Sequence, residues 1–215
     1  MQCGPVRFSA DAKVQMASQT FARLLVPRFT SYRELADEKS TYARMVQKMS
    51  EDVNRNRLIT DDVCEALKEG RTPIVLTGLT AHVETLAKAL APHCKHVVTL
   101  VGSEPAKEKL RRMEYLQNVN PSEPLVIVAT GKYVGEGFDY PRLDTLFLAL
   151  PVSWKGIVAQ YAGRLHREYT GKKEVRIYDY IDIRMPMCDV MYRRRLKGYA
   201  SVGYNQAGET GGCIC

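Results

Sequence analysis

The feature that most constrains the fold is a change of pattern at Pro73, after which short apolar runs alternate with amphipathic helical segments. Apolar runs separated by helices are typical of a parallel sheet covered on both faces. The sequence therefore predicts an α/β fold over residues 70–183, with an open parallel sheet and helices on both faces. In such a sheet, ligands bind at the carboxyl ends of the strands. The expected strands are residues 74–77, 97–101, 125–129, 145–150 and 175–181.

The region before this domain is richer in charge and mostly helical in pattern, so residues 10–69 are predicted to be a helical linker or insertion. The apolar residues at its start make an irregular helical stripe that Pro27 interrupts. A second helix is expected over about residues 40–54, and a third is expected to be capped by Asp61 or Asp62. A stripe of Met and Tyr usually reflects core packing, so no chemistry is assigned here.

The region after the domain, residues 184–215, is predicted to be a basic extension with a loose, glycine-rich tail. A short helix is expected to carry its basic cluster, which consists of Arg193, Arg194, Arg195 and Lys197. This cluster and the basic helix over residues 107–112 have the charge to follow a nucleic-acid backbone, although such runs are more often solvated faces.

Composition narrows the class of protein. The 215 residues contain 31 Lys and Arg against 24 Asp and Glu, a net charge of +7 that suits a polyanionic partner. The six cysteines form no Cys-x-x-Cys pair and no secretory leader precedes them, so we expect reduced thiols and a cytoplasmic protein. No apolar run approaches a membrane span. His93, Cys94 and His96 form the single metal-like cluster, but a zinc site needs a fourth ligand and wider spacing, so no metal is expected.

The chain contains no complete phosphate-binding P-loop. Gly131-Lys132 fails the G-x-x-x-x-G-K-[ST] pattern because Val126 and Tyr133 occupy positions that require Gly and Ser or Thr. Gly171-Lys172 also fails, since His166 occupies the first glycine position. Any ATP chemistry must therefore take its main phosphate site from another domain.

Two segments of the predicted domain carry candidate chemistry. The loop Gly135–Asp139 follows a buried strand, where two glycines permit close backbone approach and Asp139 can accept from a ribose hydroxyl or an arginine. A plain turn is the alternative. In the next helix, Gln160, Arg164 and Arg167 share one face, and two arginines there make an anion clamp or else a solvated basic face. Gly163 within the same helix suggests close approach of another backbone.

The segments ATGKYVGEGFD and QYAGRLHR, in this order and spacing, resemble motifs V and VI of superfamily 2 helicases. More narrowly, they resemble the bacterial DEAD/DEAH-type helicases related to type III restriction subunits and to the UvrB group. The unit PIVLTGLTAH resembles motif IV, and the opening MQCGPVRF resembles the last strand of the family's first RecA-like domain. The resemblance extends to about Tyr204. It implies that residues 70–183 are the second RecA-like domain and that residues 1–9 are the exit strand of a missing first motor domain.

The resemblance also implies roles for individual residues. Arg167 would be the arginine finger on the γ-phosphate of ATP, Arg164 a second contact, and Gln160 the link to the first domain. Four residues would face the nucleotide: Gly135, Glu136, Gly137 and Asp139. Three would face the nucleic-acid backbone: Thr77, Gly102 and Thr130. ATP and Mg would be bound mainly by the missing first domain, so neither is expected on this chain alone.

The function implied is the second motor domain of an ATP-dependent nucleic-acid helicase or translocase, with DNA favoured over RNA as the strand and neither excluded by the sequence. Its partner would be the N-terminal RecA-like domain, and the chain alone would have little or no ATPase activity. A non-catalytic, RecA-like nucleic-acid-binding module is the alternative. A stand-alone Rossmann-like enzyme ranks last, because Leu76–Ala81 does not match G-x-G-x-x-G.

Overall fold

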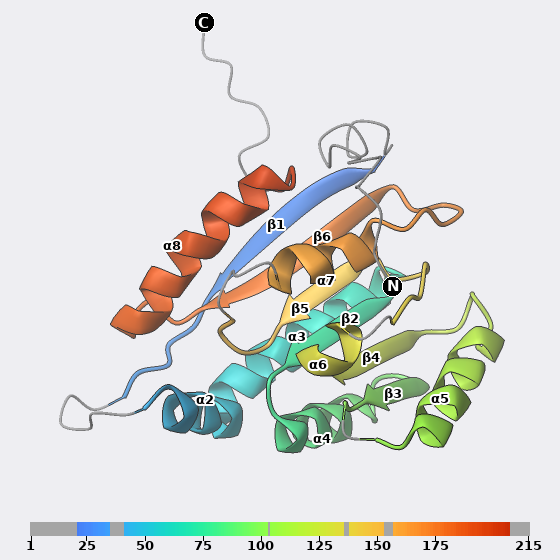
Figure 1. The fold of residues 1–215 in the computed structure, drawn as a ribbon, viewed down its shortest axis with the longest axis horizontal. Helices are drawn as coiled ribbons and strands as arrows, with labels where there is room; N and C mark the ends of the chain where they lie inside the picture. Colours follow the sequence, from blue (N-terminus) through green and yellow to red (C-terminus); the bar gives the residue numbers. More distant parts are fainter. Residues whose placement is uncertain (1–20, 35–40, 103, 136–137, 153–156, 207–215) are drawn as a thin grey trace, which may run out of the picture.

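The computed structural model describes residues 21–34, 41–102, 104–135, 138–152 and 157–206. These residues form a seven-stranded, entirely parallel sheet with helices on both faces (Figure 1), and the strand order is β3-β4-β2-β5-β6-β1-β7. The predicted fold class is therefore confirmed. The strands are β1 (Ala22–Phe29), β2 (Pro73–Thr77), β3 (His96–Leu100), β4 (Leu125–Thr130), β5 (Thr145–Leu148), β6 (Glu174–Ile181) and β7 (Asn205–Gln206). The helices are α2 (Tyr42–Glu51), α3 (Val53–Lys68), α4 (Thr80–Leu90), α5 (Ala106–Asn118), α6 (Gly131–Gly135), α7 (Ile157–Leu165) and α8 (Pro186–Ser201).

The two faces of the sheet bury different helices, as the alternation along β4 illustrates. Leu125 and Ile127 point to the face covered by α5, α6, α7 and α8, while Val126 and Val128 point to the face covered by α3 and α4. All six residues of β4 are buried. Because successive side chains of a strand point to opposite faces, a strand that is apolar throughout needs cover on both.

The helical prediction for residues 10–69 is wrong at Ala22–Phe29, which form strand β1 and pair in parallel with β6. Residues 10–20, which share the predicted stripe, lie outside the described part of the chain. Pro27 does not break a helix here. It lies beyond the two residues of β1 that pair with β7, where β1 becomes an edge and the missing N–H of proline costs no ladder bond. The first segment of the predicted linker is thus part of the sheet.

Two other boundaries also differ from expectation. The helix predicted to be capped by Asp61 or Asp62 begins about two and a half turns earlier, at Val53, because the Asp52 side chain accepts from Arg55 N at 2.7 Å and caps it. The helix of the basic extension is longer than the short one predicted. It is the 16-residue helix α8, and it is followed by β7, which adds to the sheet beside β1. Residues 207–215, the predicted tail, lie outside the described part.

A smaller apolar cluster lies against the carboxyl ends of β5 and β6. Met45, Val46 and Met49 of α2 pack there with Leu150, which follows β5, and with Cys188 of α8. Helix α2 therefore covers part of the sheet edge at which ligands usually bind.

Candidate nucleotide and nucleic-acid interface

The three predicted nucleic-acid-binding residues lie together at the carboxyl ends of neighbouring strands β3, β4 and β2. Thr77 and Thr130 are the last residues of β2 and β4 and are paired across the ladder. Gly102 follows β3 and donates its backbone N–H to Thr130 Oγ1 at 3.1 Å. The sheet thus brings the three residues to one place.

The hydroxyl groups at this edge are occupied within the chain. Thr77 is 3% exposed, and its Oγ1 lies 2.9 Å from His82 Nδ1. The other ring nitrogen of His82 lies 2.9 Å from Asn56 Oδ1, which can only accept, so Nε2 carries the proton and Thr77 donates to Nδ1. Burial lowers the pKa of His82 to about 4, which keeps the ring neutral at pH 7. These threonines order the edge rather than present free hydroxyls.

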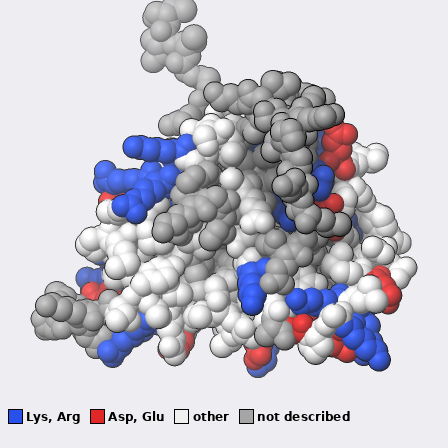
Figure 2. Space-filling view, in the orientation of Figure 1, with Lys and Arg blue, Asp and Glu red and all other residues white. Residues whose placement is uncertain are grey.

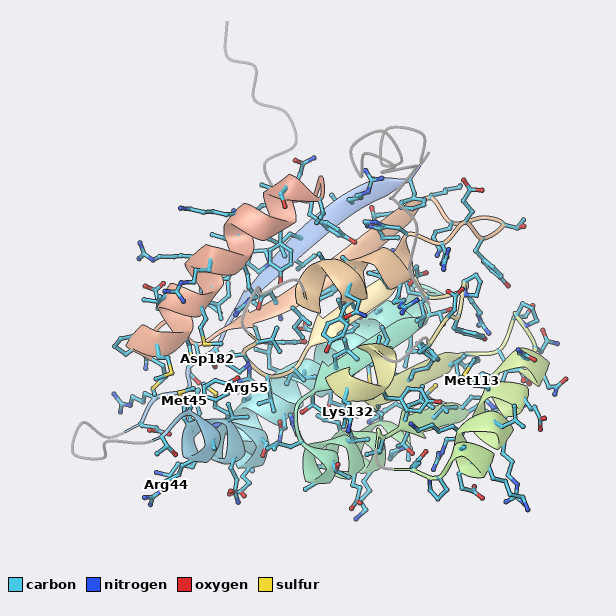
Figure 3. The ribbon with its side chains drawn as sticks, in the orientation of Figure 1. Arg44, Met45, Arg55, Met113, Lys132 and Asp182 are labelled. Carbon is cyan, nitrogen blue, oxygen red and sulfur yellow. The ribbon has the colours of Figure 1, made fainter. Side chains whose placement is uncertain are left out.

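The exposed groups at the same edge are different residues. Gly78 and Thr80 at the start of α4 are exposed, and so is Lys132 on α6 (Figure 3). A Cβ placed on Gly102 would meet the Lys132 side chain at 3.2 Å, so this lysine lies against the Gly102 backbone. The sequence does not place Lys132 in a P-loop, yet its exposed side chain packs against Gly102, which donates the hydrogen bond to Thr130.

The other half of the carboxyl edge is closed by side chains from outside residues 70–183. Tyr42 donates to Pro151 O at 2.8 Å, Arg55 donates to Ala149 O, and Arg195 donates to Val152 O at 2.9 Å. Helices α2, α3 and α8 therefore hold the carbonyls that follow β5. This leaves the ends of β3, β4 and β2 as the open part of the edge.

Both arginines of this group belong to buried ion pairs. Arg55 pairs with Asp182 at 3.0 Å (Figure 3), and Arg195 pairs with Asp179 through two bonds of 2.8 and 2.9 Å. Arg195 is 1% exposed, so its expected place in an exposed basic cluster is wrong. Arg195 directly follows Arg194 in the sequence, but successive residues of a helix are rotated by about 100° around its axis. The side chain of Arg195 therefore points inward while that of Arg194 is exposed.

Asp139 and Arg167 form an ion pair of 3.1 Å, with about half of each side chain exposed. The pair does not lie at the carboxyl edge that the sequence pattern indicated. Lys172 Nζ contacts both Arg167 O and Leu143 O, and Leu143 lies two residues before the start of β5. Asp139 and Arg167 therefore lie on the amino-terminal side of β5, because α6 and α7 carry the chain back across the sheet after β4 and β5 (Figure 1).

The remaining residues of the predicted clamp lie on α7, which ends at Leu165, so the prediction that Gln160, Arg164 and Arg167 share one helix face is wrong for Arg167. Arg164 is half-buried, and its Nε is buried without a hydrogen-bond partner in the described structure. Gln160 is exposed and makes an interaction within the chain. Gly163 has open space where a Cβ would stand, so the close backbone approach expected there is absent from the described residues. Glu136 and Gly137 lie outside the described part, and Gly135 is described only as the end of α6.

Tyr161 joins the two candidate segments, a connection that the sequence did not indicate. Its ring is buried, and its hydroxyl lies where a Cβ on Gly131 would come within 2.1 Å. Gly131 follows Thr130 directly and begins α6. The glycine is thus required for α7 to pack against the start of α6.

Basic side chains gather over α8 and α5 in the view of Figure 2. On α8, Arg193, Arg194 and Lys197 are exposed. On α5, Lys107 and Arg111 are exposed, whereas Arg112 donates to Thr99 Oγ1 and pairs with Glu104 at 3.0 Å. On each helix, therefore, fewer basic residues are exposed than the run of basic residues in the sequence suggests.

The described residues contain no group of three metal-binding side chains, and Cys64, Cys94 and Cys188 are free thiols. Both ring nitrogens of His96, from the metal-like cluster, are engaged by Tyr115 and Glu123. No described helix combines the length and apolar character needed to cross a bilayer.

Comparison with known proteins found partial relatives. No protein-family profile matches the chain. It is 28% identical over 137 residues to the transcript termination protein A18 of Fowlpox virus (strain NVSL), which covers 62% of this chain and 29% of the relative. It is 30% identical over 122 residues to the A18 protein of Cowpox virus (strain Brighton Red), covering 56% of this chain and 24% of the relative. The matched part is thus about a quarter of these curated relatives.

Solved structures with a similar fold have low sequence identity. T4 UvsW has a TM-score of 0.69 at 18% identity and covers 88% of this chain and 41% of that chain. S. cerevisiae Dbp5 bound to RNA and ADP BeF3 has a TM-score of 0.57 at 13% identity, covering 86% of this chain and 41% of that chain. The C-terminal part of the Fun30 ATPase domain has a TM-score of 0.55 at 15% identity, covering 76% and 48%. Together with the parallel sheet, these similarities identify the fold of the described residues as RecA-like α/β.

Proposed function

We propose that this chain is the second motor domain of an ATP-dependent nucleic-acid helicase or translocase of superfamily 2. It works with a first RecA-like domain that carries the Walker motifs, ATP and Mg. We call the two together the two-domain assembly, whether they form one polypeptide or two. A cytoplasmic location and a narrower kinship with the bacterial type III restriction and UvrB groups are parts of the same proposal.

The observation that carries the proposal is the state of Arg164 and Arg167. Arg167 is half exposed, is held by Asp139, and lies two residues beyond the end of α7, which carries Arg164, whose Nε has no described partner. A guanidinium group in this position can leave its surface ion pair at little cost, because exposed pairs contribute about 1 kcal/mol or less. It can then fork onto phosphate oxygens that another domain presents. The open space at Gly163 leaves room for that domain to approach.

The second site of the proposal is the open carboxyl edge of β3, β4 and β2. The exposed backbone at Gly78 and the ammonium group of Lys132 suit the phosphate backbone of a single strand, without base recognition. The poxvirus relatives are transcript termination proteins, and the Dbp5 structure contains RNA and ADP BeF3. We propose that this chain prefers single-stranded DNA. A preference for RNA is the alternative, and measuring the affinity for both strands distinguishes the two.

Separation of the two sites by the sheet supports a motor over a passive platform. The strand-binding edge lies at the carboxyl ends of the strands and the Asp139–Arg167 pair lies on the amino-terminal side of β5, while Tyr161 packs α7 against Gly131, next to Thr130. Domain closure around nucleotide would therefore act on the same rigid unit that holds the strand. In the non-catalytic alternative, Lys132 would still bind the strand but the arginines would have no role in hydrolysis.

ATP hydrolysis by the chain alone and by the two-domain assembly tests the proposal. We expect the isolated 215 residues to show only background hydrolysis, because the chain has no P-loop, and the assembly to hydrolyse ATP when single-stranded nucleic acid is added. The measurement is phosphate release at saturating ATP, with and without the strand. Turnover by the isolated chain at about 1 per second or faster, which is ordinary enzyme turnover, would contradict the proposal.

Replacement of Lys132 by alanine is expected to weaken binding of single-stranded DNA to a similar extent for all sequences. The slope of log affinity against log salt concentration should fall by about 0.7 to 1, because one phosphate contact is lost. The measurement is a titration at several salt concentrations with two unrelated oligonucleotides. Lys88→Ala, an exposed position toward the far end of α4, is the matched control and should leave the slope unchanged.

A further inference from the structure

We propose that Lys172 is a positioning residue for Arg167 and the end of α7: its ammonium group holds the main chain on both sides of the Asp139–Arg167 ion pair in register. The inference deepens the proposed function and rests on it, because the register matters for the phosphate contact that Arg167 would make. In the sequence, Gly171-Lys172 does not complete a P-loop pattern, and the proposed function gives Lys172 no role.

The contacts of Lys172 join two separate segments. Its Nζ lies 2.7 Å from Pro141 O and 2.7 Å from Leu143 O, in the segment that leads from Asp139 to β5. It also lies 3.0 Å from Leu165 O and 2.7 Å from Arg167 O, at the end of α7. An ammonium group has three hydrogens, so four carbonyls share three donors. The last carbonyls of a helix lack partners within it, and a cation there satisfies them.

The local backbone explains how the side chain reaches this position. Gly171 has a φ of +86°, and Lys172 N donates to Tyr169 O at 3.0 Å, so residues 169–172 form a tight turn. Only glycine adopts this conformation without strain. The turn directs Lys172 back under the end of α7, whereas Lys173 next to it is exposed.

The burial of Lys172 argues against an ordinary solvated lysine. Burial lowers its pKa to about 8, and the nearby Asp144 acts in the opposite direction. Placing an ammonium group in such surroundings costs free energy unless it is hydrogen-bonded, and the four carbonyls supply that compensation. A buried cation bonded only to main-chain carbonyls orders the chain around it.

The Asp139–Arg167 pair cannot impose this order by itself. With about half of each side chain exposed, it contributes about 1 kcal/mol or less. Lys172 binds the carbonyl of Arg167 and a carbonyl two residues after Asp139, so it fixes both members through their own backbones. Its Nζ faces carbonyls rather than the guanidinium group, which makes it a positioning residue and not a catalytic one.

The test compares Lys172→Met and Lys172→Arg with the matched control Lys173→Met. In the two-domain assembly, Lys172→Met is expected to lower kcat for ATP hydrolysis by about 10- to 100-fold, the usual cost of a misplaced catalytic group, with KM nearly unchanged. In an Arg167→Ala background the same substitution should have less than about a twofold effect, because coupled residues are not additive. Lys173→Met should behave as the unsubstituted protein.

Hydrogen exchange on the isolated chain separates this inference from the proposed function. Amides of residues 142–144 and 167–169 should exchange at least about tenfold faster in Lys172→Met but not in Lys173→Met. Unchanged exchange, or an equal loss of kcat with and without Arg167, would overturn the role of Lys172. If exchange in the isolated chain is faster in Lys172→Met but kcat of the assembly does not depend on Arg167, the proposed function is wrong. Lys172 then only orders the backbone. If Lys172→Met does not fold, Lys172→Arg, which keeps the charge in a different shape, decides by the same measurements.

Discussion

Arg167→Ala is expected to lower kcat of the two-domain assembly by about 10³-fold or more, the range observed for arginine fingers in phosphoryl transfer. The guanidinium group would offset the negative charge that develops on the γ-phosphate, and alanine leaves that charge without a partner. Because the interaction forms in the transition state, KM for ATP should change far less than kcat. The measurement is steady-state ATP hydrolysis at saturating nucleic acid.

Arg57→Ala is the matched control for this substitution. Arg57 is also an exposed arginine in a surface ion pair with an aspartate, but it lies on α3, where 81% of its side chain is exposed. It should leave kcat unchanged. Strand binding should be retained in Arg167→Ala, because the open carboxyl edge lies at the other end of the strands from Arg167. Retained hydrolysis in Arg167→Ala, with strand binding intact, would favour the non-catalytic binding module.

Arg195→Met is expected to lower the free energy of unfolding of this chain by about 3 to 5 kcal/mol, the usual cost of removing one partner of a buried ion pair. Asp179 would keep only the hydroxyl of Tyr199, at 2.9 Å, to compensate its buried charge. The carbonyl of Val152 would lose its donor as well. The measurement is urea unfolding followed by far-UV circular dichroism, with the midpoint converted through a common slope.

Arg193→Met on the same helix is the matched control. Arg193 is 75% exposed and pairs with Asp189 one turn away, so its replacement should cost about 0.5 kcal/mol or less. Adding Asp179→Asn to Arg195→Met should recover part of the loss, because the uncompensated charge is then gone. A loss below about 1 kcal/mol for Arg195→Met would mean that Asp179 finds another partner, and would contradict the rigid connection between α8 and the sheet.

The local residue pattern was sufficient to predict the strands in the centre of the chain but not the strand near its start. The strands from β2 to β6 were predicted because β2, β4 and β5 are buried throughout and read as short apolar runs, and β3 and β6 keep apolar residues at their buried positions. Strand β1 was missed because Leu25 is its one fully buried residue, and the alternation of a half-covered strand near the sheet edge is weak. Its partner β6 lies about 150 residues later, so no local signal reports the pairing.

The candidate site was likewise predicted from the sequence only in part. Sequence placed Thr77, Gly102 and Thr130 at strand ends, and a parallel sheet necessarily gathers such residues at one edge. It also predicted that Arg164 and Arg167 share one helix, but α7 ends at Leu165 and Arg167 lies beyond it. It put Arg167 and Asp139 at the wrong edge, however, because the length of the return through α6 and α7 is not visible in a motif. Lys132 and Lys172 were set aside, since their importance comes from backbones that are distant in sequence.

The sequence by itself determined which segments are buried strands, which residues share a helix face, and that the chain has no P-loop, because these depend on residue type and short spacing alone. The tertiary structure decided which side of the sheet each group faces, that Arg195 belongs to the core rather than to a basic surface, and that one half-buried lysine joins the two halves of the arginine site. Those outcomes depend on contacts between residues far apart in the chain, and periodicity over a few residues carries no information about such contacts.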